Sequence, residues 1–129
     1  MIQLPIAVGL KVREHVVVEE KTRHVTLVNC VRRLRFREIP SPPRSLTACV
    51  VLTDGRGDCE LSLTVSPLST WEVMWQRTWK ARFIDPVRQR WFLISIPDIF
   101  FPDPGRYGIE LIIEGHPIAQ TVLDILPEE

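Results

Sequence analysis

The sequence has no apolar run close to the roughly 20 residues that a membrane-spanning helix needs. It has no excess charge of one sign either, because 16 basic residues balance 16 acidic ones. A neutral chain has no overall field that would draw it to nucleic acid or to an anionic membrane. The start of the chain lacks a basic segment and carries Pro5 within its apolar run, unlike a secretory signal. We therefore expect a cytoplasmic protein that binds no membrane.

Cysteine is scarce, and its spacing is uninformative for metal binding. There are three cysteines, Cys30, Cys49 and Cys59, and none forms a Cys-x-x-Cys pair. Each lies in an apolar, strand-like run, where a free cysteine behaves as a small hydrophobic residue. The odd number and these positions fit a reducing compartment.

Recognisable catalytic patterns are missing as well. There is no Gly-x-Ser-x-Gly elbow, no phosphate-binding loop and no zinc-type His–Glu helix spacing. The histidines are scattered, at His15, His24 and His116. Asp54, Asp58 and Glu60 flank a glycine loop and could hold a hard cation, but an acidic turn without an ion is the favoured interpretation. We expect no enzymatic activity, no cofactor and no metal site.

What the chain does contain is strand patterning. Its 129 residues suit one domain, 1–129, and a hydrophobic content of 45% is enough for a core. Turn signals recur about every 8–12 residues, a spacing typical of a β-sandwich. The expected fold is an all-β, antiparallel sandwich of about seven to nine strands.

The clearest element is a hairpin near the C-terminus. Pro102 and Pro104 restrict the backbone before Gly105, which can adopt a positive φ and complete a turn. From Tyr107 to Ile113 the apolar residues alternate with residues that are mostly polar, the period of a half-buried strand. A turn at 114–117 then leads into a second apolar strand over 118–126.

Two other segments predict strand connections. In the segment 24–36 the apolar side switches near Val31, which predicts a bulge or a strand that leaves one sheet for the other. The proline-rich stretch 39–44 then predicts an extended crossover between sheets. The runs 46–53 and 59–66 flank two glycines, Gly55 and Gly57, and predict a hairpin.

The segment 71–83 is ambiguous. As a strand it places Trp71, Trp75 and Trp79 on one face together with Phe83, whereas the same tryptophans also match the i, i+4 spacing of a helix. Its aromatic content and the β character of the rest of the chain favour a strand, with a helix over part of it as the alternative.

The tryptophans and neighbouring arginines are the best candidates for an interface. Four tryptophans exceed what so small a core requires, and tryptophan and arginine are enriched at interaction hot spots. Some of them can instead be core residues, and the same set could stack on sugar rings. The expected partner-binding residues are Trp71, Trp75, Arg77, Trp79, Arg82 and Trp91.

Two basic clusters suggest an alternative. One comprises Arg32, Arg33, Arg35 and Arg37, and the other Arg77, Lys80, Arg82, Arg88 and Arg90. If their strands were neighbours, a basic stripe would cross one sheet and could bind RNA or another anionic ligand. The neutral net charge makes a solvated face paired with glutamates the favoured interpretation, and nucleic acid the less favoured partner.

The order Asp103, Gly105, Tyr107 resembles the tyrosine corner of immunoglobulin-like sandwiches, in which the tyrosine hydroxyl bonds to the backbone upstream. Ile109 stands where antibody domains have cysteine. Together with Glu14–Val18 and Val25–Asn29, this corner resembles an uncharacterised group of small bacterial immunoglobulin-like β-sandwich proteins. The resemblance implies the fold, with Asp103, Gly105 and Tyr107 in structural roles, and implies no activity.

The favoured hypothesis is a non-enzymatic, cytoplasmic interaction module. It would bind a protein partner, or itself as a homodimer, through a sheet edge or the Trp/Arg face. The alternative is a sandwich that binds a ligand or RNA along the basic stripe.

Overall fold

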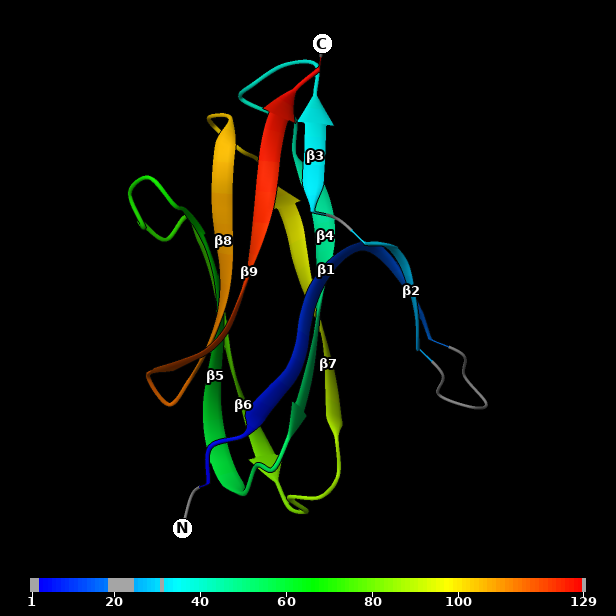
Figure 1. Cartoon of the computed structure of the whole chain (residues 1–129), viewed down its shortest axis with the longest axis vertical. Coiled ribbons are helices and arrows are strands. Elements are labelled where there is room, and N and C mark those ends of the chain that lie inside the picture. The colour runs from blue at the N-terminus through cyan, green and yellow to red at the C-terminus, as the bar shows by residue number, and fades with distance from the viewer. Residues whose placement is uncertain (1–2, 19–24, 31, 129) are drawn as a thin grey trace.

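The computed structural model describes residues 3–18, 25–30 and 32–128, with side chains described outside 14–31. Within these ranges the chain forms nine strands and no helix, which confirms the all-β prediction (Figure 1). The strands are β1 (Ile6–Val18), β2 (Val25–Cys30), β3 (Arg33–Phe36), β4 (Arg44–Thr53), β5 (Gly57–Pro67), β6 (Trp75–Phe83), β7 (Arg90–Ile99), β8 (Gly105–Ile113) and β9 (His116–Pro127).

The strands form two sheets. A four-stranded sheet has the order β2-β1-β4-β7, and a five-stranded sheet has the order β3-β9-β8-β5-β6. All neighbours are antiparallel except β3 and β9, which are parallel. β1 bends along its length, so that its second half and β2 turn away from the rest of the molecule (Figure 1).

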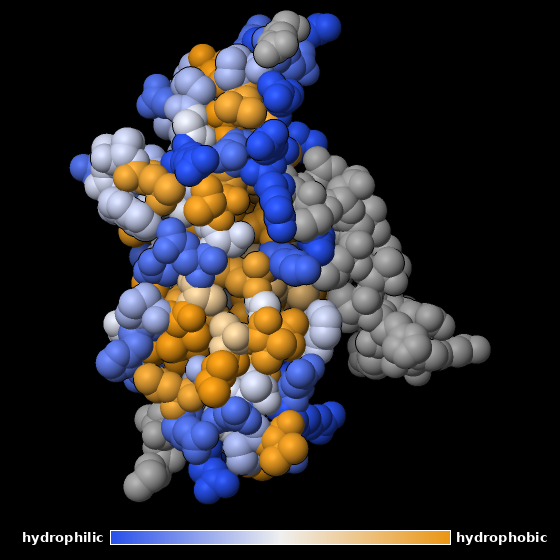
Figure 2. Space-filling model, viewed as in Figure 1, coloured by the Kyte–Doolittle hydropathy of each residue, from blue (hydrophilic) through white to orange (hydrophobic). Residues whose placement is uncertain are grey.

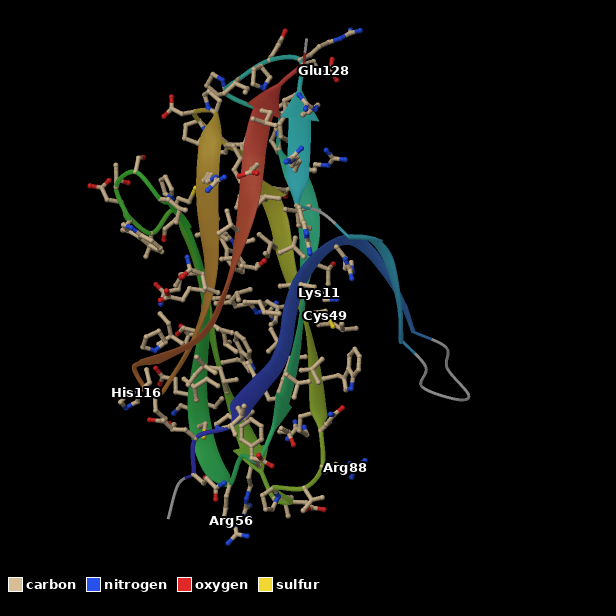
Figure 3. The ribbon with its side chains drawn as sticks, viewed as in Figure 1. Lys11, Cys49, Arg56, Arg88, His116 and Glu128 are labelled. Carbon is tan, nitrogen blue, oxygen red and sulfur yellow. The ribbon has the colours of Figure 1, made fainter. Side chains whose placement is uncertain are left out.

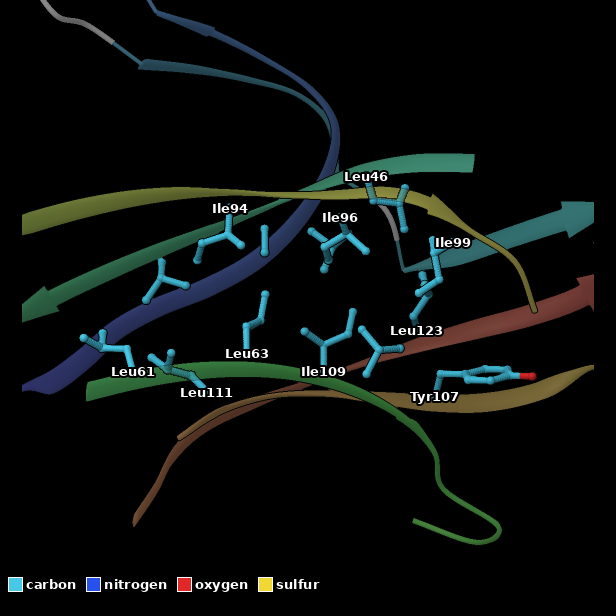
Figure 4. Close-up of a cluster of buried hydrophobic side chains, with 14 of the residues drawn as sticks. Leu46, Leu61, Leu63, Ile94, Ile96, Ile99, Tyr107, Ile109, Leu111 and Leu123 are labelled. Carbon is cyan, nitrogen blue, oxygen red and sulfur yellow. The ribbon is translucent and has the colours of Figure 1, made fainter. Parts of the chain in front are cut away.

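The core lies between the two sheets, as Figure 4 shows. Alternate residues of β4 and β8 point inward, from Leu46 to Leu52 and from Tyr107 to Ile113, and these side chains are at most 2% exposed. Burying one such leucine or isoleucine contributes about 1.5–3 kcal/mol, so the inward rows stabilise the pairing of the sheets. The period of two seen in the sequence therefore corresponds to this core.

The predicted C-terminal hairpin is confirmed. β8 pairs antiparallel with β9, and Glu114 and Gly115 form the two-residue turn with φ angles of 50° and 78°. Two positive φ angles are typical of the type I′ turn, whose twist matches the flanking strands. The Glu114 N–H donates to the carbonyl oxygen of Glu60 at 2.9 Å, and the Glu60 N–H donates to the Glu114 carboxylate at 2.8 Å.

The turn that precedes this hairpin is held by Tyr107. Its hydroxyl donates to the carbonyl oxygen of Asp103 at 2.6 Å, and the Asp103 N–H donates back to the hydroxyl at 3.3 Å. The ring is 2% exposed and packs edge-on against Phe101, with 4.9 Å between centroids. Burial raises the pKa of Tyr107, partly offset by the hydrogen bond to Asp103. Gly105, with φ of 139°, allows the chain to enter β8 in this geometry.

The hairpin predicted over 46–53 and 59–66 is wrong. β4 lies in the four-stranded sheet between β1 and β7, whereas β5 lies in the five-stranded sheet between β8 and β6. The loop between them is a crossover, held in place by backbone bonds between Gln3 and Arg56 of 2.8 and 3.0 Å. Both strands carry an apolar row, and the two rows face each other across the core instead of lying side by side.

Three other predictions from the sequence are confirmed. The segment 24–36 changes sheets, because β2 belongs to one sheet and β3 to the other, while Val31 and His24 lie outside the described residues. The stretch 39–44 crosses between sheets as predicted, and β6 is a strand over Trp75–Phe83. β1 is one long strand over Ile6–Val18, with an irregularity between Ala7 and Gly9.

Candidate functional site: an open sheet edge and an outer sheet face

The six residues predicted to form one partner-binding face lie in different places. Trp71 precedes β6 on the outer side of the five-stranded sheet, and its ring lies above Gly108 of β8, 3.4 Å from where a Cβ would stand. Trp91 is 49% exposed on β7, in the other sheet. Arg82 points outward from β6 and pairs with Asp58 at 3.8 Å. A single continuous face is not formed by these side chains.

Trp75 and Trp79 point toward the core from β6. Both are partly buried and pack against the core cluster. Trp79 contacts Phe92 of β7 with 6.1 Å between ring centroids, so it bridges the two sheets at their margin. Arg77 has the same parity and is exposed at the rim between them. The alternation expected for a strand is thus present, and it places these two tryptophans in packing contact with the core.

β6 is the last strand of its sheet, so one of its sides has no strand partner among the described residues. The directions in which the N–H and C=O groups of β6 point can be derived from the hydrogen bonds of the neighbouring strand β5. Glu60 accepts from Glu114 on the β8 side, whereas Val65 accepts from the Met74 N–H on the β6 side, at 2.9 Å in both cases. In an antiparallel sheet these directions alternate from residue to residue.

Odd-numbered residues of β5 therefore point their backbone groups toward β6, where they are in register with the odd-numbered residues Trp75 to Phe83. The even-numbered residues of β6 must then point their N–H and C=O groups toward the open side. The Arg82 carbonyl does so, because it accepts a hydrogen bond from outside the sheet. The open edge of β6 consists of the backbone groups of Gln76, Thr78, Lys80 and Arg82.

Arg90 closes one end of this edge. It starts β7, and its Nη1 donates to the Arg82 carbonyl oxygen at 2.7 Å. Its guanidinium lies 5.5 Å from the centroid of Phe83 and 5.1 Å from that of Phe92. In these cation–π contacts the guanidinium lies over both rings. The outward backbone groups of Gln76, Thr78 and Lys80 have no strand partner among the described residues.

The open edge is cationic. β6 carries Arg77, Lys80 and Arg82, all exposed, and it has no acidic residue. Asp58 on the neighbouring strand pairs with Arg82, but both side chains are well exposed, and such pairs contribute about 0–1 kcal/mol. The edge thus combines unpaired backbone groups with three cationic side chains, of which Lys80 and Arg82 lie opposite Glu60 and Asp58 of β5.

The predicted basic stripe is wrong in its geometry. β3, with Arg33 and Arg35, and β6 belong to the same sheet but lie at its opposite edges, separated by three strands. Near β3, Arg33 pairs with Asp124 at 3.9 Å, and Arg37 pairs with Glu128 at 3.7 Å. The two basic clusters are therefore separate surfaces.

A second surface feature lies on the outer face of the four-stranded sheet. Pairing of the strands places Gly9, Val51 and Trp91 in one row and Lys11, Cys49 and Leu93 in the next. Apolar side chains are exposed here, with Val8 at 56% and Trp91 at 49%. Figure 2 looks onto the margin between the two sheets, where apolar side chains reach the surface over the lower part of β1. The face is unusually apolar for the outside of a sheet.

This face is hollowed above Gly9. A Cβ built on Gly9 would meet no atom within 4 Å, so the missing side chain leaves an open space. The resulting hollow has a volume of about 230 Å³, and it is lined by Val8, Gly9, Lys11, Cys49, Val51, Gln89 and Trp91. Figure 3 shows Lys11 and Cys49 beside each other, and the two residues are paired across β1 and β4.

Arg13 lies one step beyond Lys11 on the same face of β1. It is only 7% exposed, and its Nε and Nη1 have no hydrogen-bond partner among the described residues. Leaving buried donors unpaired costs about 1–3 kcal/mol, so the position is energetically unfavourable as it stands. Burial raises the pKa of Cys49, and the positive charges of Arg13 and Lys11 lower it. Both cations are thus close to the thiol.

The remaining candidates from the sequence are not assembled into a site. No group of three His, Cys, Asp or Glu side chains suited to a metal ion occurs in the part of the chain that was described. Cys49 and Cys59 are buried free thiols, and burial also raises the pKa of Cys59. The side chains of His15 and Cys30 lie outside the described set. Within the described ranges, no helix is long and apolar enough to cross a membrane.

Comparisons with known proteins give no information on the function of this chain. No protein-family model matches the chain, and no curated protein matches it. A solved structure of Pseudomonas fluorescens alkylpurine DNA glycosylase AlkC, bound to DNA containing an abasic site analog, is similar with a TM-score of 0.49 and 9% identity. The similarity covers 91% of this chain and 30% of the glycosylase chain. At this level it supports no conclusion about function.

Sequence reasoning predicted a sheet edge as a binding surface but not which strand forms it, and it missed the hollow. The edge of β6 consists of backbone groups, which leave no mark in the sequence until the strand order is known. The sequence contained one weak indication of the hollow. Residues 48–52 of β4 are apolar on both faces, whereas a half-buried strand would alternate apolar and polar residues.

Proposed function

We propose that this chain is a non-enzymatic interaction module of the cytoplasm, and that it binds an acidic, extended segment of a partner protein along the open edge of β6. The partner segment would add a sixth strand to the five-stranded sheet. Its backbone would pair with Gln76, Thr78 and Lys80, and its carboxylates would lie near Arg77, Lys80 and Arg82. This mode of recognition gives affinity through main-chain hydrogen bonds and specificity through side chains.

We further infer that the fold is immunoglobulin-like in arrangement. Two features support this: two facing sheets made almost wholly of antiparallel pairs, and the hydrogen bond from the Tyr107 hydroxyl to the backbone of Asp103. Such sandwiches present their edge strands and end loops to partners, which agrees with a binding role for β6.

The observation that carries the proposal is the unpaired, regular edge of β6. Proteins usually protect a sheet edge with a bulge, a proline, a very short strand or a covering segment. β6 is nine residues long with neither proline nor glycine, and its pairing with β5 has no irregularity. Its protection consists of cationic side chains, which deter cationic or neutral strands but attract an acidic one.

Charge also argues against a second copy as the occupant. Two β6 strands paired antiparallel would bring Arg77, Lys80 and Arg82 of each copy together without an acidic residue between them. Like charges across a strand pair are destabilising. An acidic partner strand would instead neutralise them.

The test uses a fluorescein-labelled peptide of alternating glutamate and valine, long enough to span β6, and a control peptide with lysine in place of glutamate. Binding is measured by fluorescence anisotropy with the full chain. We expect the acidic peptide to bind and the basic peptide not to bind. In hydrogen exchange, the amides of residues 78 and 80 should become protected when the acidic peptide is bound.

A matched pair of variants separates backbone pairing from simple charge attraction. Lys80→Pro and Lys80→Ala lose the same charge, but only proline removes the outward N–H, so we expect Lys80→Pro to bind about tenfold more weakly than Lys80→Ala. Equal affinities for the two variants would rule out edge pairing. Light scattering that shows a dimer disrupted by Lys80→Pro would replace the acidic partner with a second copy and overturn the proposal.

A further inference from the structure

A second binding site, independent of the β6 edge, is built into the outer face of the four-stranded sheet. We propose that the hollow above Gly9 binds a small carboxylate with a flat apolar body, such as an aromatic acid, with the body against Trp91 and Val51 and the carboxylate at the Lys11 end. Four features of the structure define this ligand.

The first is the shape of the hollow. Gly9 is the only member of its row without a side chain, and the hollow of about 230 Å³ lies above it. Neighbouring strands are about 4.8 Å apart, so the row from Gly9 through Val51 to Trp91 is roughly as wide as a fused pair of aromatic rings. The hollow therefore suits a single flat molecule.

The second is the apolar lining. Val8, Val51 and Trp91 present aliphatic and indole surface, and Trp91 is 49% exposed and open to stacking. A ligand ring laid against the indole would remove apolar surface from water on both partners. A wholly polar ligand would gain nothing from this lining.

The third is the placement of positive charge at one end. Lys11 lines the hollow, and no salt bridge is formed by it in the described part of the chain. An anionic group on the ligand would sit beside this ammonium while its apolar body lies toward Trp91. The site has no acidic side chain in its lining, so the preference is for an anion.

The fourth is Arg13. It is 7% exposed, and its Nε and Nη1 have no acceptor in the described part of the chain, although buried guanidinium groups are normally paired. It lies two residues beyond Lys11 on the same face of β1, and its charge reaches the Cys49 thiol that lines the hollow. A carboxylate between Lys11 and Arg13 would supply part of the missing negative charge.

The test uses 2-naphthoate, with its neutral analogue 2-naphthamide as the control ligand. Binding is followed by amide and indole chemical shifts of the full-length protein. We expect 2-naphthoate to shift the signals of Gly9, Lys11, Val51 and the Trp91 indole, and 2-naphthamide to bind about fivefold or more weakly. Equal affinity for the two ligands, or shifts that map to another surface, would overturn the proposal.

Three variants sharpen the result. Gly9→Leu fills the hollow and should abolish binding, and Lys11→Gln should weaken 2-naphthoate about fivefold while leaving 2-naphthamide unchanged. Arg35→Gln removes an exposed cation on the distant strand β3 and should leave both affinities unchanged. If Gly9→Leu fails to fold, Lys11→Gln and the ligand pair still decide the question. Unchanged 2-naphthoate binding in Lys11→Gln would refute the anion site without bearing on peptide binding at β6.

Discussion

Arg90 of β7 and Arg82 of β6 are joined across the margin of the two sheets, because Nη1 of Arg90 donates to the carbonyl oxygen of Arg82 at 2.7 Å. The same guanidinium lies against Phe83 and Phe92. One side chain thus links the edge strands of both sheets and covers the end of the core. The remainder of the β6 edge, toward Gln76, is left open to a partner.

Replacing Arg90 with alanine should destabilise the protein by about 1–3 kcal/mol, because it removes a charge-assisted hydrogen bond and two cation–π contacts. Urea unfolding followed by tryptophan fluorescence measures the loss. Arg88→Ala is the matched control, because Arg88 is exposed in the preceding loop, and it should change stability by less than about 0.5 kcal/mol. Equal effects of the two substitutions would show that the Arg90 contacts contribute nothing.

Tyr107→Phe should cost about 1–2 kcal/mol, because the ring still fits while the bond to Asp103 is lost and a partly buried backbone carbonyl loses its donor. Thermal unfolding at pH 7 checks this value. A substitution that leaves the melting temperature unchanged would mean that the turn at 102–105 is held by its prolines and glycine alone.

The same residue predicts a pH dependence. Burial raises the pKa of Tyr107, so the folded state keeps its proton at pH values where the unfolded chain, with a pKa of about 10, has released it. The stability that protonated Tyr107 contributes to the folded state is complete below pH 10, and it is lost as the pH rises above that value. The stability of the native protein should therefore fall more steeply between pH 10 and higher values than that of Tyr107→Phe. Parallel curves for the two proteins would contradict this assignment.

Gly105→Ala should destabilise the protein by about 1–2 kcal/mol, because its φ of 139° lies in a region that side chains other than glycine rarely adopt. Gly9→Ala is the control, since the new methyl group would meet no atom within 4 Å and no positive φ is required there. We expect that substitution to be neutral or slightly stabilising, as judged by urea unfolding. A similar loss at both positions would show that flexibility, and not the backbone angle, matters.

Cys49 and Cys59 should resist alkylation in the folded protein. Both thiols are buried, and burial raises the pKa of each, so little thiolate forms near neutral pH. Iodoacetamide labelling at pH 7.5, read by peptide mass spectrometry, should modify them at least about tenfold more slowly than in urea. Rapid labelling of Cys49 in the native state would show that the outer sheet face opens.

The sequence by itself determined the strand content and the residues that face the core. Alternation of apolar and polar residues is a local property, so the strands from Tyr107 to Ile113 and over 118–126 and the Tyr107 turn could be predicted from neighbouring residues alone. For 71–83 the local pattern favoured a strand but also matched a helix, and the structure has a strand over Trp75–Phe83. The change of sheet within 24–36 was also readable, because the apolar parity switches there.

Only the tertiary structure decided which strands are neighbours. The segments 46–53 and 59–66 carry the signal of a hairpin, yet their partners are β1, β7, β6 and β8, because each apolar row is buried more completely across the core than beside the other. Strand order then placed the two basic clusters at opposite edges, left β6 open and brought Gly9, Val51 and Trp91 into one row. Pairing between distant segments depends on the burial of the whole core, which no local pattern encodes.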